Sequence, residues 1–66
     1  MRPKLEIDLS GPDGNVYAVV SRCCTALKKV GKGDTAAELK SKAFEQRSYD
    51  AVLELCRSYV DVTFLR

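Results

Sequence analysis

The chain has 66 residues, a formal net charge of +2, three cysteines and no histidine. That length predicts one domain, residues 1–66, with a small core that is marginally stable alone. The odd cysteine count, with Cys23 and Cys24 adjacent, disfavours disulfides, and thiolates alone would have to hold any structural zinc. We therefore expect no metal and no cofactor, and self-association as the extra source of stability.

The sequence also indicates where the protein resides. No apolar run approaches the roughly 18 residues that a membrane span requires. The N-terminal residues 1–6 are rich in charge and lack the apolar core of a signal peptide. We expect a cytoplasmic protein without a membrane partner.

The first element is a strand. Over residues 4–9 apolar and polar side chains alternate, with Leu5, Ile7 and Leu9 on one face. Alternation with a period of two is typical of a half-buried strand.

A turn follows this strand and starts the helical part of the chain. Gly11, Pro12, Asp13 and Gly14 suit a tight turn, because proline presets φ and glycine accepts unusual backbone angles. Asn15, or Asp13, can cap the next helix. A glycine-containing strand-to-helix loop can also bind phosphate. The P-loop and dinucleotide-binding patterns are absent, however, so we interpret the loop as a structural turn.

The turn does not explain two polar residues beside it, Asp8 and Ser10. If the protein contacts a small molecule or a metal, these residues are the first place to look. We expect no such contact there.

The first helix is predicted from Asn15 or Val16 to Val30. Apolar residues recur every three or four positions and form one stripe, whereas two lysines occupy the last turn and complement the helix dipole. Gly31 follows as the terminator.

The second helix is predicted from a capping box, in which Thr35 and Glu38 cap each other's backbone amides, to about Gln46. Its apolar set is thin: Ala36, Leu39, Ala43 and Phe44.

The third helix is predicted from about Tyr49 to Ser58, with Ser48 as its N-cap and Asp50 in the first turn. Because no glycine or proline separates it from the second helix, one bent helix is an alternative.

Residues 60–65 alternate again, with Val60, Val62 and Phe64 on one face, and form the second strand. The predicted fold is therefore α+β, with the order β-α-α-α-β in two layers. The N- and C-terminal strands form a two-stranded sheet with the helices on one face. Base rates favour antiparallel pairing, although strict up-and-down alternation of the five elements would give a parallel pair.

The sequence offers little for catalysis. Cys23 and Cys56 fall on apolar helix stripes, and none of the three thiols has an activating histidine or a helix N-terminus, so we expect core packing. Cys24, on the flank of its stripe, should be the thiol that a reagent labels most readily. No pair of carboxylates forms a recognisable acid–base arrangement. We expect a protein that is not an enzyme and has no small-molecule substrate.

Basic residues in the middle of the chain give a second functional hypothesis. Seven of them would form a basic surface on the first two helices and the segment that follows, and such cations supply most non-specific affinity for nucleic acid. The candidate nucleic-acid or anion contacts are Arg22, Lys28, Lys29, Lys32 and Lys40, with Lys42 and Arg47 nearby.

The opening segment, residues 7–15, followed by Ser48-Tyr49-Asp50 and a closing strand, resembles a group of short uncharacterised proteins of bacteria and their phages. The resemblance rests mainly on the first motif. It implies an intracellular location and a phage origin, and it implies no catalytic or binding residue.

The sequence therefore favours a small protein-interaction module, which associates with itself or with another protein. A two-stranded sheet alone is marginal in water, so a dimer would either extend the sheet to four strands or bury the helical face. The alternative is a nucleic-acid-binding accessory protein.

Overall fold

One strand precedes and one strand follows three helices in the chain, which confirms the predicted α+β fold. The computed structural model describes residues 2–11 and 14–65. The strands are β1 (Lys4–Asp8) and β2 (Asp61–Leu65). The helices are α1 (Val16–Lys29), α2 (Gly33–Ala43) and α3 (Tyr49–Tyr59).

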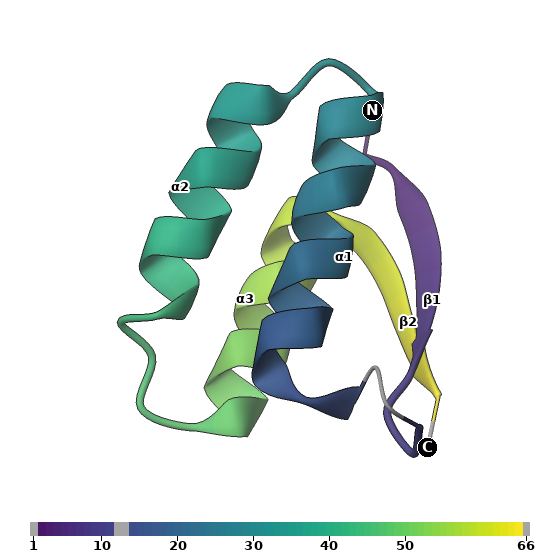
Figure 1. The fold of residues 1–66 in the computed structure, drawn as a ribbon, viewed down its shortest axis with the longest axis vertical. Coiled ribbons are helices and arrows are strands. Elements are labelled where there is room, and N and C mark those ends of the chain that lie inside the picture. Colours follow the sequence, from purple (N-terminus) through teal and green to yellow (C-terminus); the bar gives the residue numbers. More distant parts are fainter. Residues whose placement is uncertain (1, 12–13, 66) are drawn as a thin grey trace.

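The two strands pair in parallel, so the expectation of antiparallel pairing is wrong. Lys4 lies opposite Asp61, and the register continues to Asp8 opposite Leu65. The physical reason is the number of elements between the strands. Three helices that alternate in direction return the chain to its starting end, and β2 therefore runs the same way as β1 (Figure 1).

The helices cover one face of the sheet and leave the other face open. Figure 1 shows α1 and α3 against the strands, with α2 packed on their far side. The inward side chains of both strands and the apolar stripes of the helices form one core. Its largest fully buried side chains are Ile7, Val19, Cys23, Leu27, Leu39, Cys56 and Val60.

Capping interactions define both ends of α1. The Asn15 Oδ1 accepts a hydrogen bond of 2.8 Å from the Ala18 amide. At the other end, the amides of Gly31 and Lys32 donate to the carbonyls of Lys28 and Leu27, at 3.1 and 2.9 Å. This pair of bonds is a Schellman motif, and Gly31 has the positive φ of 78° that the motif needs.

The start of α2 differs from the prediction. It begins at Gly33 with Lys32 as N-cap and no side-chain cap, so the expected capping box of Thr35 and Glu38 is wrong. The Schellman motif turns the chain so tightly that the next helix starts two residues before Thr35. Asp34 in the first turn still complements the helix dipole.

Helices α2 and α3 are separate, which removes the alternative of one bent helix. The backbone after Ala43 continues in single turns, in which the Gln46 amide donates to the Ala43 carbonyl at 3.2 Å. Ser48 is extended and its hydroxyl accepts from the Ala51 amide at 3.1 Å, as predicted for the N-cap of the third helix.

The loop between β1 and α1 is held at several points. The Gly14 amide donates to the Gly11 carbonyl at 3.0 Å, which closes a turn. The Tyr49 hydroxyl, from the start of α3, donates to the Gly14 carbonyl. Pro12 and Asp13 lie outside the described residues. These contacts join the loop to α3 as well as to its own neighbours.

Candidate interaction surfaces

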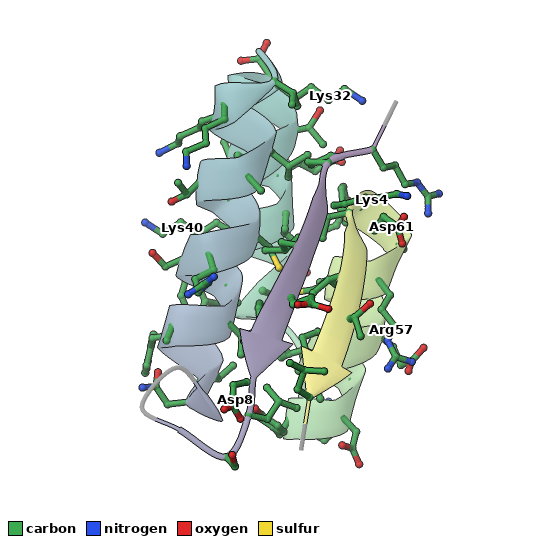
Figure 2. All side chains as sticks on the ribbon, turned by 90° about the vertical axis from the view of Figure 1, so that its right-hand side faces the viewer. Lys4, Asp8, Lys32, Lys40, Arg57 and Asp61 are labelled. Atoms are coloured by element: carbon green, nitrogen blue, oxygen red, sulfur yellow. The ribbon has the colours of Figure 1, made fainter. Side chains whose placement is uncertain are left out.

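The five predicted basic residues do not line one groove. Lys28 and Lys40 line a groove between α1 and α2. Arg22 and Lys29 line a different groove, between α1 and β1, together with Lys4. Lys32 lies outside both grooves, and Figure 2 shows it well apart from Lys40. Lys28 and Lys29 separate because consecutive residues of an α-helix point about 100° apart.

Three exposed aromatic side chains gather where the ends of the helices meet. Tyr17 at the start of α1 is 68% exposed and Phe44 after α2 is 52% exposed, and their ring centroids lie 5.6 Å apart. Tyr49, at the start of α3, lines a hollow of about 270 Å³ together with both rings. We call Tyr17, Phe44 and Tyr49 the aromatic patch.

Cations border this aromatic patch. On one side lies the groove of about 360 Å³ that Lys28 and Lys40 line, together with the rings of Tyr17 and Phe44. On the other side, Arg47 lines the same hollow as Tyr49. Aromatic rings and arginine are enriched at protein interfaces, and rings beside lysines also suit the bases and phosphates of nucleic acid.

Sequence reasoning missed the aromatic patch. The apolar set predicted for the second helix includes Phe44, but α2 ends at Ala43, and Phe44 is its C-cap with a side chain that is 52% exposed. Tyr17 carried a usable signal, because its position lies off the stripe of Val16, Val19 and Val20 in α1. An aromatic residue on the polar side of a helix is a candidate contact residue.

The three cysteines are free and buried, as the core-packing interpretation requires. The Cys24 thiol donates to the Ala36 carbonyl at 3.3 Å and is 8% exposed, more than either other cysteine. Contact with the Cys56 thiol, together with burial, raises the pKa of Cys23. Burial also raises the pKa of Cys24. A raised pKa keeps a thiol protonated and unreactive at neutral pH.

Asp8 and Ser10 are accounted for by contacts with each other. The Asp8 Oδ1 accepts from the Ser10 hydroxyl at 2.6 Å and from the Ser10 amide at 2.9 Å. The bond from the hydroxyl, and to a smaller extent the bond from the amide, holds the pKa of Asp8 below its ordinary value of 3.8. This pair therefore closes the end of β1 with a local turn.

Replacing Ser10 with alanine is expected to raise the pKa of Asp8 towards 3.8. The substitution removes the hydrogen bond from the Ser10 hydroxyl, which lowers this pKa more than the bond from the Ser10 amide does. A carboxylate with a lowered pKa stabilises the fold above its unfolded pKa, and that contribution disappears as the pH falls through the folded pKa. The stability difference between wild type and Ser10→Ala should therefore vanish in acid. NMR titration of the Asp8 carboxyl measures the shift. Thr63→Ala removes a hydroxyl from β2 and should leave the pKa of Asp8 unchanged. If the pKa of Asp8 were also unchanged in Ser10→Ala, the hydrogen bond between Ser10 and Asp8 would be contradicted.

The remaining observations concern ligands, membranes and relatives. Among the described residues, no group of three or more histidine, cysteine, aspartate or glutamate side chains is placed to hold a metal ion. Within residues 2–11 and 14–65, no helix has both the length and the apolar character that crossing a membrane requires. No protein-family model, curated protein or solved structure matches the chain.

Proposed function

We propose that this chain is a small, non-enzymatic protein-interaction module that forms a homodimer through the aromatic patch. The observation that carries the proposal is the exposure of Tyr17 and Phe44, at 68% and 52%, in contact with each other. Large aromatic side chains in such positions supply much of the binding energy at protein interfaces. Burying them against a second copy also adds apolar contact to a core that is small for a free-standing domain.

The charges on the sheet favour a dimer interface on the helical face over a dimer that extends the sheet. The open outer face of β1 and β2 carries Lys4, Glu6, Asp8 and Asp61, all exposed (Figure 2). Charged residues on a face or an edge oppose sheet-to-sheet association. Of the exposed large apolar residues, only Leu65 lies in a strand of the described sheet.

The non-enzymatic part of the proposal is supported by the surroundings of the titratable groups. No charged or polar residue is buried among the described residues, so carboxylates and lysines keep contact with water. Catalytic acids and bases usually depend on burial or charge partners that shift their pKa. The buried thiols of Cys23 and Cys24 have raised pKa values, which keep them protonated and unreactive.

We expect the wild-type protein to show concentration-dependent dimerisation in analytical ultracentrifugation at micromolar concentrations. Tyr17→Ser and Phe44→Ser should each weaken the dimer by at least about tenfold, because each removes an aromatic contact. Leu65→Ser is the matched control, since Leu65 is also large, apolar and 44% exposed but lies on the sheet. A wild-type monomer at high micromolar concentration would contradict the dimer, and equal weakening by all three variants would contradict the surface.

A second candidate function, binding of single-stranded nucleic acid, is favoured by the place of Lys28 and Lys40 beside the rings of Tyr17 and Phe44. The two functions differ in how added salt changes the binding affinity. Added salt screens the repulsion between the lysines of two copies and should strengthen the dimer. The same salt should weaken nucleic-acid binding, because the release of condensed counterions is less favourable at higher salt. Fluorescence anisotropy with a labelled oligonucleotide over a salt series measures the second effect.

A further inference from the structure

The strand β1 has one edge that does not face β2. The Asp61 amide donates to the Pro3 carbonyl at 2.9 Å, and the Leu9 amide donates to the Leu65 carbonyl at 2.7 Å. Along a strand, successive residues direct their backbone groups to opposite edges. The amides and carbonyls of Lys4, Glu6 and Asp8 therefore face the edge away from β2. Such an edge is a template for another strand.

A groove of about 540 Å³ lies beside this edge at the N-terminal end of β1. Pro3 and Leu5 form part of the wall on the strand side, and Ala26 and Val30 of α1 form part of the wall on the helix side. Figure 2 shows why the groove exists: α1, the blue helix, extends beyond β1 on the side away from β2. A strand added beside β1 would lie over this flank of α1 and cover apolar surface there.

The charge of the groove selects its occupant. Lys4, Arg22 and Lys29 line it, and no carboxylate does so within the described residues. Glu6 and Asp8 do not line the groove, and Asp8 lies at the opposite end of the strand from Lys4 (Figure 2). The groove therefore offers more favourable charges to an acidic side chain than to a basic one.

We propose that this groove binds an extended acidic segment of a partner protein, which adds to the sheet as a third strand beside β1. Main-chain hydrogen bonds to the free edge supply affinity, and the cations supply the preference for acidic side chains. The Arg22 guanidinium now donates to the Glu6 carbonyl at 3.5 Å, at the long limit of a hydrogen bond. In the complex, an amide of the added strand donates to the Glu6 carbonyl in place of Arg22, and the Arg22 guanidinium binds the acidic side chains of the partner. None of the three residues of the aromatic patch lines this groove, so this interaction goes beyond the proposed dimer.

The test uses the full chain, labelled with ¹⁵N, and short capped peptides in which valine alternates with glutamate or with lysine. The glutamate peptide should shift the amide signals of Lys4, Glu6 and Asp8, and should bind at least about tenfold more tightly than the lysine peptide. Lys29→Glu should weaken its binding by about tenfold, and Lys28→Glu by less than about twofold. The two variants are matched, because both change the same charge in the last turn of α1 but only Lys29 lines this groove.

Two glutamate peptides, N-methylated on alternate residues in the two possible registers, test the strand geometry without altering the protein. One of them should lose binding and the other should keep it, because only alternate amides of an added strand face β1. The proposal is overturned if both methylated peptides bind equally, or if the two lysine variants weaken binding equally. It is also overturned if the lysine peptide binds as well as the glutamate peptide, or if the shifted signals map to the groove between α1 and α2.

Discussion

Replacing Leu27 with alanine is expected to lower the free energy of unfolding by about 2–5 kcal/mol, the range for a leucine removed from a packed core. The Leu27 side chain is fully buried in α1 and belongs to the single core cluster of the described residues. A protein of this size has a total stability of only about 3–10 kcal/mol. The variant should therefore be close to unfolding, as urea titration followed by circular dichroism would show.

Two further variants make this result specific. Leu27→Met keeps the volume of the side chain and should cost less than about 1.5 kcal/mol. Leu65→Ala removes the same atoms from a side chain that is 44% exposed, and should cost under about 1 kcal/mol. If Leu27→Ala cost no more than Leu65→Ala, the core would not be packed as described. The comparison needs one protein concentration throughout, since the proposed dimer would add to apparent stability.

Gly14→Ala has the second large expected effect, a loss of about 1–3 kcal/mol or more. A Cβ at this position would lie 2.1 Å from the Leu9 carbonyl oxygen and 2.8 Å from its carbon. Both atoms belong to the backbone, so no side chain can move aside to relieve the contact. The loop would have to shift, and with it the carbonyl that accepts the Tyr49 hydroxyl.

Gly11→Ala is the matched control in the same loop. Its added Cβ would lie 4.0 Å from the Asp8 carbonyl oxygen, an ordinary contact distance, and the substitution should change stability by less than about 1 kcal/mol. Thermal unfolding of the two variants beside the wild type measures the difference. Similar losses in both would mean that backbone flexibility, and not the approach to Leu9, explains the requirement for glycine.

Much of the fold could be predicted because local patterns and tertiary packing agree. Alternation around Ile7 and the stripe through Cys23 each identify a buried face without knowledge of any other element. Asn15 and Ser48 are helix N-caps whose partners lie only three residues away. Such signals depend on a few neighbouring residues, so the sequence alone contains them.

The features that could not be predicted depend on relations between elements. The parallel pairing of the strands follows from the directions of three helices, which no single segment encodes. Thr35 has the pattern of a capping residue, but the Schellman motif at Gly31 fixed the start of α2 earlier in the chain. Lys28 and Lys29 are neighbours in sequence, yet the packing of α2 and β1 around α1 assigns them to different grooves.

The pairing of the first strand with the last has a consequence for synthesis on the ribosome. Lys4 cannot meet Asp61 until all three helices have been made, and β2 is complete only at Leu65. Helices α1 and α2 contact each other directly and can associate while the rest of the chain is still being translated. Pairing of the two strands, by contrast, closes a loop that spans nearly the whole domain. The hydrogen bonds that offset the entropy of this loop closure can form only when synthesis is complete. Until then the edge of β1 that pairs with β2 is without its partner strand, so early folding rests on contacts among the helices and between α1 and β1.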